Sequence, residues 1–118
     1  MSFRIRKEFH FSASHRLSHL PDDHPCARLH GHNYVVVVEL SAEAPGPDGF
    51  VRDYRELAAF KDHIDETLDH RHLDDVLDVP STAENLARHL FDWCAARWPE
   101  TSAVAVSETP KTWAEYRP

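Results

Sequence analysis

The sequence predicts an α+β fold, in which an antiparallel sheet carries two helices on one of its faces. Two long segments, residues 3–15 and 30–42, have the alternating or β-branched pattern of strands. The next two segments place apolar residues at helical spacing, and further β-formers close the chain. With 118 residues the chain can bury one core but not two, so we expect a single domain over residues 1–118.

The first two strands are separated by a loop. Residues 3–15 alternate in character, so the odd-numbered positions share one face of the strand. The apolar members of that face are Phe3, Ile5, Phe9, Phe11 and Ala13. Residues 16–29 contain two prolines and an Asp-Asp pair, which indicates a loop before the second strand at about residues 30–42.

Two helices are predicted in the middle of the chain. Asp53 can cap the first helix, with Glu56 three residues later. The second helix opens at Ser81, where Glu84 completes a capping box. The apolar faces are Leu57, Phe60, Ile64 and Leu68 in the first helix, and Leu86, Leu90, Phe91 and Cys94 in the second. Cys94 is therefore expected to be a core thiol.

The C-terminal part is expected to add two more strands. Residues 102–109 form the first, with Val104 and Val106 directed inward, and a short last strand runs through Trp113 and Tyr116. The predicted element order is ββααββ. A sheet of this kind has two open edges, which proteins usually pair or cover, so we expect a homo-oligomer formed by edge-to-edge pairing.

Composition argues against several partners and locations. A net charge of −7, without a basic stripe, disfavours binding to the phosphate backbone of nucleic acids. The N-terminus lacks the apolar core of a signal peptide, and no apolar run approaches the roughly 18 residues that cross a membrane. Two cysteines without paired spacing indicate a reducing compartment, so we expect a cytoplasmic protein without disulfides.

Three histidines suggest a catalytic metal site. His30 and His32 are alternate residues of the second strand, so their imidazoles project from the same face. His15 closes the first strand on its apolar, odd-numbered face, and can supply a third ligand from the neighbouring strand. Three imidazoles suit zinc and leave one position open for water or substrate, as in catalytic sites. The alternative is a chance pairing of histidines in a chain that has 10 of them.

Cys26 lies four residues before His30, in a polar loop. A nearby imidazolium, cationic group or metal would lower the pKa of this thiol and make it reactive. The alternative is an idle loop thiol.

Asp69 and His70 follow the first helix, and a histidine oriented by a carboxylate is the usual base partner of a reactive thiol. Adjacent helical side chains do not face one another, so this pair can cooperate only if the helix has ended or an irregular backbone brings the two side chains together. The alternative is a solvated helix end. Glu108 shares the parity of Val104 and Val106, which directs its carboxylate inward toward a partner with N–H donors, unless it lies beyond the core in solvent.

Five spaced motifs resemble one family across essentially the whole chain. They are Ser-Ala-Ser-His15-Arg-Leu, Cys26-Ala-Arg-Leu-His-Gly-His-Asn-Tyr, Leu-Asp-His70, Thr82-Ala-Glu-Asn-Leu and Ser-Glu108-Thr. Together they resemble the 6-pyruvoyltetrahydropterin synthase superfamily, and more narrowly its bacterial branch, the 6-carboxy-5,6,7,8-tetrahydropterin synthases of the queuosine, or 7-deazapurine, pathway. The resemblance implies the tunnelling fold (T-fold), in which ββααββ subunits close into a trimeric barrel and two trimers commonly stack as a hexamer.

The resemblance also implies an activity. The substrate would be a small pterin, 7,8-dihydroneopterin triphosphate, and the products 6-carboxy-5,6,7,8-tetrahydropterin, acetaldehyde and triphosphate, with Zn²⁺ as the cofactor. By position, it implies metal ligands at His15, His30 and His32, catalytic residues at Cys26, Asp69 and His70, and substrate contacts at Glu108, Thr82 and Lys111. In the family the site is assembled where subunits meet. Ser81 departs from the proline that relatives often have before the Thr82 motif.

Two alternatives stay open. The first is the 6-pyruvoyl branch of the same superfamily, which stops before carbon–carbon cleavage. The second is of another class, a non-catalytic zinc-binding module or a three-histidine hydrolase, which would have no use for Cys26, Asp69, His70 or Glu108.

Overall fold

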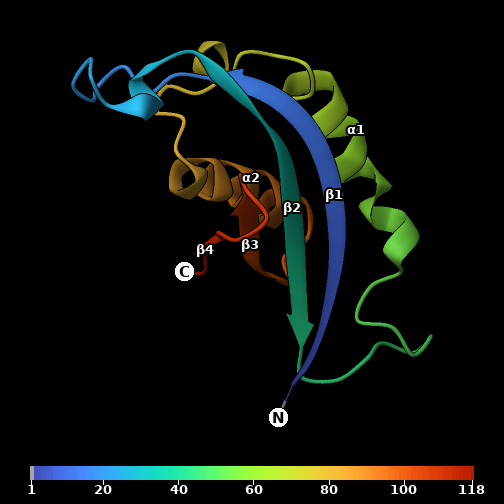
Figure 1. Cartoon of the computed structure of the whole chain (residues 1–118). Coiled ribbons are helices and arrows are strands. Elements are labelled where there is room, and N and C mark those ends of the chain that lie inside the picture. The colour runs from blue at the N-terminus through green and yellow to red at the C-terminus, as the bar shows by residue number, and fades with distance from the viewer. Residues whose placement is uncertain (1) are drawn as a thin grey trace.

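The computed structural model describes residues 2–118 as a four-stranded antiparallel sheet, in the order β1-β2-β3-β4, with two α-helices (Figure 1). The strands are β1 (Phe3–His15), β2 (His30–Ala42), β3 (Thr101–Ser107) and β4 (Ala114–Tyr116). The helices are α1 (Ala58–Thr67) and α2 (Ala83–Arg97), with three short 3-10 helices, η1 (Pro25–Ala27), η2 (Tyr54–Leu57) and η3 (Leu73–Asp75). The predicted α+β class and ββααββ order are confirmed.

The strands β1 and β2 form a long hairpin that curves along the molecule (Figure 1). Its register runs from Phe3 opposite Ala42 to His15 opposite His30. Both strands span the residues that the sequence pattern predicted. The last residue of β1 and the first of β2 therefore lie side by side, next to the loop of residues 16–29.

One face of the sheet forms the core together with both helices. Val36, Val38 and Leu40, at alternate positions of β2, have 0% exposure, and they share one apolar cluster with residues of α1 and α2. All the residues predicted for the apolar faces of the helices are buried there: Leu57, Phe60, Ile64, Leu68, Leu86, Leu90, Phe91 and Cys94. The prediction of two helices on one face is confirmed. Burial also raises the pKa of the Cys94 thiol, as befits a core residue.

The starts of both helices differ from the prediction. Asp53 caps η2, accepting from Arg55 N at 2.9 Å, and α1 begins only at Ala58. The cap of α2 is Thr82 rather than Ser81, because Thr82 Oγ1 accepts from Asn85 N at 3.2 Å. The predicted capping box at Ser81 is therefore wrong by one residue.

The ends of the predicted strands also differ. β3 ends at Ser107 instead of residue 109, because Ser107 Oγ donates to the carbonyl of Thr109 and the chain turns there. β4 begins at Ala114, so Trp113 lies outside it and is exposed. Phe3 is 54% exposed, although its parity predicted an inward position, because the hairpin extends past the helices at this end (Figure 1).

The outer edge of β1 is covered only near its C-terminal end. His70 N donates to Ser12 O at 2.6 Å, and Ser14 N donates to Arg71 O at 3.1 Å. Among residues 2–118, no backbone hydrogen bond covers that edge over residues 3–11. A long strand edge is thus available for pairing, and the predicted oligomer stays a prediction.

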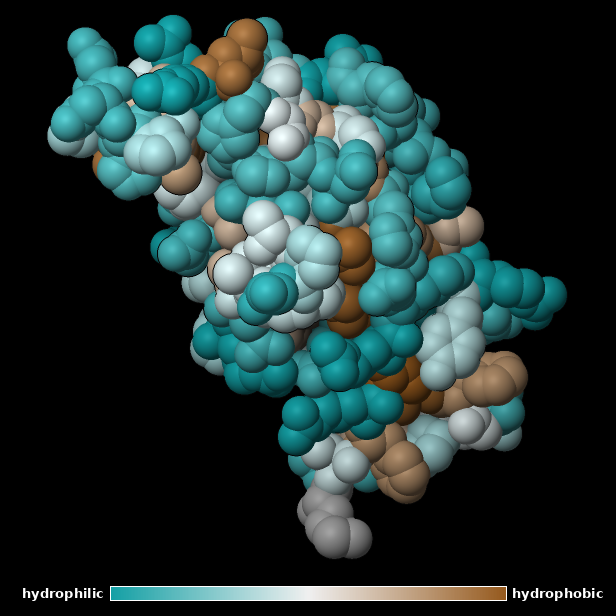
Figure 2. All heavy atoms as spheres, viewed as in Figure 1, coloured by the Kyte–Doolittle hydropathy of each residue, from teal (hydrophilic) through white to brown (hydrophobic). Residues whose placement is uncertain are grey.

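Hydrophilic residues cover most of the surface in the view of Figure 2, and apolar residues show only in scattered places. The exposed large apolar side chains are Phe3, Leu29, Phe50, Tyr54, Val79 and Trp113. Within residues 2–118 no helix has the length and apolar character needed to span a membrane.

Candidate metal centre and active site

Three histidines meet at the end of the β1–β2 hairpin. His15 closes β1, while His30 and His32 lie at the start of β2. The Nε2 atoms of His15 and His30 lie 2.9 Å apart, and one nitrogen of each of the three rings lies within 4.8 Å of the others. His15 is almost fully buried, at 1% exposure. The convergence that strand parity predicted is confirmed.

Backbone carbonyls orient two of these rings. His15 Nδ1 lies 2.8 Å from Ser81 O, and His30 Nδ1 lies 2.7 Å from Arg28 O. A carbonyl oxygen only accepts, so each Nδ1 carries the proton and each Nε2 keeps a lone pair. Two lone pairs 2.9 Å apart repel one another unless they share a cation. The donor set therefore fits a divalent metal such as zinc, with a coordination position left open.

His32 completes the group beside a carboxylate. Its Nε2 lies 3.8 Å from Glu108 Oε2. Burial holds the pKa of His32 below its ordinary value, against the opposite effect of Glu108, and His15 and His30 lower it further. The neutral imidazole, which is the form that binds metal, is therefore favoured.

Glu108 also lines a pocket at the N-terminal end of α2. This pocket has a volume of about 390 Å³, and Thr82, Val106 and Trp113 are among its lining residues. Although Glu108 lies just past β3, its side chain is only 25% exposed and lies beside His32. Thr82 is thus placed beside Glu108, whereas Lys111 is exposed in the β3–β4 turn and does not line the pocket.

Cys26 lies in η1, within the loop that joins β1 to β2. Its N–H donates to His24 Nδ1 at 3.0 Å, and its carbonyl accepts from Leu17 N at 2.9 Å. The backbone is thereby fixed on both sides, while the thiol is partly exposed. Cys26 is not part of the histidine group. Nor does any hydrogen bond or ion pair within residues 2–118 join its side chain to Asp69 or His70.

Asp69 and His70 form a pair after α1 has ended at Thr67. His70 Nδ1 lies 2.9 Å from Asp69 Oδ2, and the backbone at His70 is left-handed, with a φ of 59°. Asp69 Oδ1 also accepts from Ser12 N at 3.0 Å. The Ser12 N–H first, and then His70, hold the pKa of Asp69 below its ordinary value. The condition for cooperation, a helix that has ended, is confirmed, yet the His70 side chain is 82% exposed.

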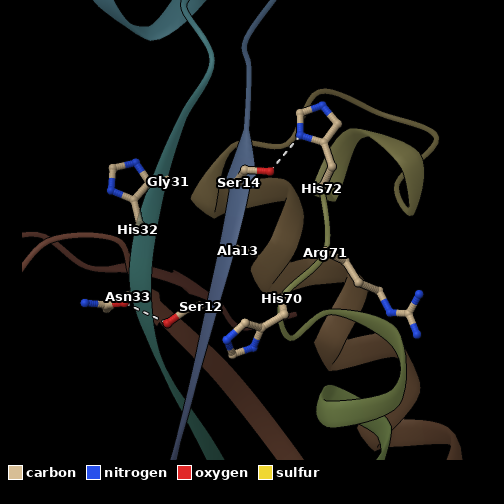
Figure 3. A pocket seen from close by; sticks show the side chains of 9 residues that line it. All are labelled: Ser12, Ala13, Ser14, Gly31, His32, Asn33, His70, Arg71 and His72. Atoms are coloured by element: carbon tan, nitrogen blue, oxygen red, sulfur yellow. Dashed lines mark hydrogen bonds between the residues drawn. The ribbon is translucent and has the colours of Figure 1, made fainter.

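His70 borders a groove of about 480 Å³ beside the C-terminal end of β1, where residues 70–72 cover the edge of that strand. In Figure 3, His32 and Asn33 of β2 lie on one side of this groove, and His70, Arg71 and His72 follow β1 on the other. Cys26 and His70 thus lie in different parts of the chain, Cys26 in the loop between β1 and β2 and His70 beside the C-terminal end of β1.

The sequence analysis missed Tyr34 and Asp74. Tyr34 follows His32 on the same face of β2 and is 1% exposed, and its hydroxyl has no hydrogen-bond partner within residues 2–118. It lay inside a recognised motif, but nothing gave its hydroxyl a role. Asp74 interacts with Arg16, His72 and Ser81, which belong to three different segments. In the sequence it is marked only by the aspartate that follows it.

Comparison with known proteins gives consistent matches. The family model for 6-pyruvoyl tetrahydropterin synthase matches residues 4–118. A relative from Synechocystis, named 6-carboxy-5,6,7,8-tetrahydropterin synthase, is 36% identical over 95% of this chain and 91% of its own. The human protein named 6-pyruvoyl tetrahydrobiopterin synthase is also 36% identical, over 75% of this chain and 72% of its own.

The solved structure of the 6-pyruvoyl tetrahydropterin synthase of Caenorhabditis elegans is similar throughout. It superposes with a TM-score of 0.87 and 30% identity, covering 100% of this chain and 96% of that one. The predicted tunnelling fold is therefore confirmed. Because family model, sequence relatives and fold agree over nearly the whole chain, this protein belongs to the 6-pyruvoyl tetrahydropterin synthase family.

Proposed function

We propose that this protein is a zinc-dependent 6-carboxy-5,6,7,8-tetrahydropterin synthase of queuosine (7-deazapurine) biosynthesis. It converts 7,8-dihydroneopterin triphosphate into 6-carboxy-5,6,7,8-tetrahydropterin, acetaldehyde and triphosphate, as a cytoplasmic lyase. The observation that carries the proposal is the convergence of His15, His30 and His32, with two Nε2 atoms 2.9 Å apart, next to the pocket of Glu108.

The binding residues have separable tasks. A zinc ion held by the three histidines supplies Lewis acidity to the hydroxyl groups of the substrate side chain. Glu108 accepts the paired N–H donors of the pterin ring, a charge-assisted contact worth about 1.5–3 kcal/mol. Glu108 Oε2 lies 3.8 Å from His32 Nε2, so the glutamate that anchors the ring and the residues that hold the metal belong to one site.

The proton-transfer residues lie on two different parts of the chain. Cys26 acts as the base that removes a carbon-bound proton, and His70, oriented by Asp69, keeps the thiol ionised. Since Cys26 lies in the loop between β1 and β2, and no hydrogen bond or ion pair within residues 2–118 joins its side chain to His70, we propose that they come from different copies of the chain. The active protein is then a homotrimer or hexamer in which neighbours complete each other's sites.

The runner-up is a 6-pyruvoyltetrahydropterin synthase, which the human relative supports at the same 36% identity. Coverage does not separate the two reactions: the Synechocystis match spans 95% and 91% of the two chains, and the structure of the Caenorhabditis elegans 6-pyruvoyl tetrahydropterin synthase covers 100% and 96%. The spacing of the cysteine motif supports the carboxy-forming reaction. Three residues separate Cys26 from His30, as is typical of the carboxy-forming branch that the sequence resembles.

Product analysis tests the proposal. Zinc-loaded protein is incubated with 7,8-dihydroneopterin triphosphate, and we expect 6-carboxytetrahydropterin, acetaldehyde and triphosphate in equal amounts. If 6-pyruvoyltetrahydropterin accumulates without acetaldehyde, the runner-up is correct. If zinc-loaded protein consumes no substrate, the chain is a non-catalytic zinc-binding member of the family.

Two cysteine variants form a matched pair for the same assay. Cys26→Ala should retain zinc and lose turnover by at least about 100-fold, the contribution typical of a positioned base. Cys94→Ala removes the other thiol, which is buried in the core, and should lower stability while turnover per folded molecule is kept. Equal turnover in the two variants would remove Cys26 from the mechanism.

A further inference from the structure

A chain of hydrogen bonds leads away from the candidate metal ligand His15. Its Nδ1 donates to the carbonyl of Ser81 at 2.8 Å, and Ser81 Oγ donates to Asp74 Oδ1. The second carboxylate oxygen, Asp74 Oδ2, accepts from Arg16 N at 2.9 Å and lies 3.0 Å from His72 Nε2. One carboxylate thus connects the end of β1, the residue before the α2 cap, and η3.

The same chain continues to the segment that carries His70. Because His72 Nε2–H donates to Asp74, its Nδ1 can accept from Ser14 Oγ, which lies 3.0 Å away (Figure 3). Ser14 in turn forms an isolated parallel bridge with His72 and donates its N–H to Arg71 O at 3.1 Å. His72 is therefore held from both sides, by Asp74 and by β1, two residues after His70.

Residue 74 suits an aspartate in particular. All three groups that meet its carboxylate are donors: a hydroxyl, a backbone N–H and an imidazole N–H. An ionised carboxylate offers two oxygens that only accept, whereas an amide would turn one donor group toward these partners. Ser81, the residue that Asp74 holds, is fully buried at 0% exposure, so its hydroxyl needs a partner within the protein, and Asp74 supplies one.

We propose that Asp74 is a positioning residue that couples the metal centre to the segment bearing Asp69 and His70. By fixing Ser81 it fixes the carbonyl that sets the tautomer and direction of the His15 ring. By holding His72 it docks the His70 segment on β1. The inference rests on the proposed metal binding. Asp74 itself is assigned no contact with the substrate.

Metal binding by variants tests the first half of this coupling. Asp74→Ala should weaken zinc affinity by about 10–100-fold in chelator competition, the usual effect of losing an outer partner of a metal ligand. It should also change the visible absorption of the Co²⁺-loaded protein, because the His15 ring is free to turn. Asp74→Asn keeps one acceptor oxygen, and should recover part of the affinity while staying several-fold weaker than wild type.

Asp75→Ala is the matched control. Asp75 is the neighbouring acid in the same η3, is exposed, and makes no side-chain hydrogen bond or ion pair within residues 2–118. Its variant should match wild type in zinc affinity and Co²⁺ spectrum. Amide exchange at Ser14 and His70, measured with metal bound, tests the second half: both amides should exchange faster in Asp74→Ala and not in Asp75→Ala.

The outcomes separate this inference from the proposed function. Unchanged zinc affinity, spectrum and amide exchange in Asp74→Ala would overturn the coupling alone. Failure of wild type to bind zinc would overturn both the coupling and the proposed metal centre. If Asp74→Ala does not fold, Asp74→Asn decides the matter, and an affinity within about twofold of wild type, with an unaltered Co²⁺ spectrum, would overturn the coupling.

Discussion

Gly31 separates His30 from His32, and its replacement by alanine is expected to disturb the metal centre. A Cβ at this position would lie 3.2 Å from the carbonyl oxygen of Ala13, and 3.9 Å from Ser14 Cα. Both atoms belong to the backbone of β1, directly before His15, so neither can swing aside as a side chain could. Relief requires β1 and β2 to separate by a few tenths of an ångström.

Two opposing effects set the change in stability. Alanine restricts the unfolded chain more than glycine does, which stabilises the fold by about 0.4–1 kcal/mol where the backbone is compatible. Overpacking against a fixed backbone costs about 1–3 kcal/mol. We therefore expect the free energy of unfolding of Gly31→Ala to fall by about 0.5–2 kcal/mol.

The same separation acts on the histidines, because His15 is on one strand and His30 on the other. Widening the 2.9 Å approach of their Nε2 atoms should weaken zinc binding by about tenfold, the equivalent of roughly 1.4 kcal/mol of strain. Gly46→Ala is the control, since its Cβ would lie 3.4 Å from a side-chain oxygen of Asp48 and 3.5 Å from the carbonyl oxygen of Phe50, both ordinary contact distances. Urea unfolding and chelator competition measure both quantities. If Gly31→Ala matches Gly46→Ala in both, the steric argument is refuted.

Three further predictions concern single side chains. Glu108→Gln should weaken pterin binding by about 10–150-fold with metal content unchanged, and equal affinities by calorimetry would contradict its role. Tyr34→Phe should leave the free energy of unfolding unchanged or raise it by up to about 1 kcal/mol, because it removes a buried hydroxyl that has no partner among residues 2–118, and a clear loss would reveal a partner. Burial alone would raise the pKa of Glu39, but hydrogen bonds from Arg117 and Ser102 outweigh it and hold that pKa below 4.5. The charged form therefore stabilises the fold above about pH 4.5, and this contribution is lost as the pH falls through the lowered pKa. The difference in free energy of unfolding between wild type and Glu39→Gln should therefore shrink in acid. A difference that stays constant with pH would contradict the assignment.

Local patterns were enough to predict the elements that build the histidine centre. The alternation of residues 3–15 fixed which side chains share a face with His15, and the structure gives β1 those bounds. The His-Gly-His spacing then brought His30 and His32 to the same face of the neighbouring strand. Burial of the helix faces could be predicted in the same way, because residues three or four positions apart lie on the same side of an α-helix.

Contacts between distant segments could not be predicted in this way. The hydrogen bond from His15 to Ser81 joins residues that are 66 positions apart. The hydroxyl of Ser81 donates to Asp74 and does not cap α2. No periodicity encodes such a choice, which depends on how the η3 segment docks on β1. The position of Cys26 relative to His70 of another copy could not be predicted either. The sequence pattern places each residue within one chain, but it does not show how two copies of the chain are arranged.

A mixing experiment tests most directly whether Cys26 of one copy and His70 of another form one active site. Cys26→Ala and His70→Ala are first shown to be inactive alone, then dissociated, mixed in equal amounts and reassembled. If Cys26 and His70 act from different copies, each is intact in half of the random pairings, and about a quarter of the wild-type turnover per site should return. If turnover in the verified mixed oligomers stays at the level of the separate variants, the two residues do not act across an interface.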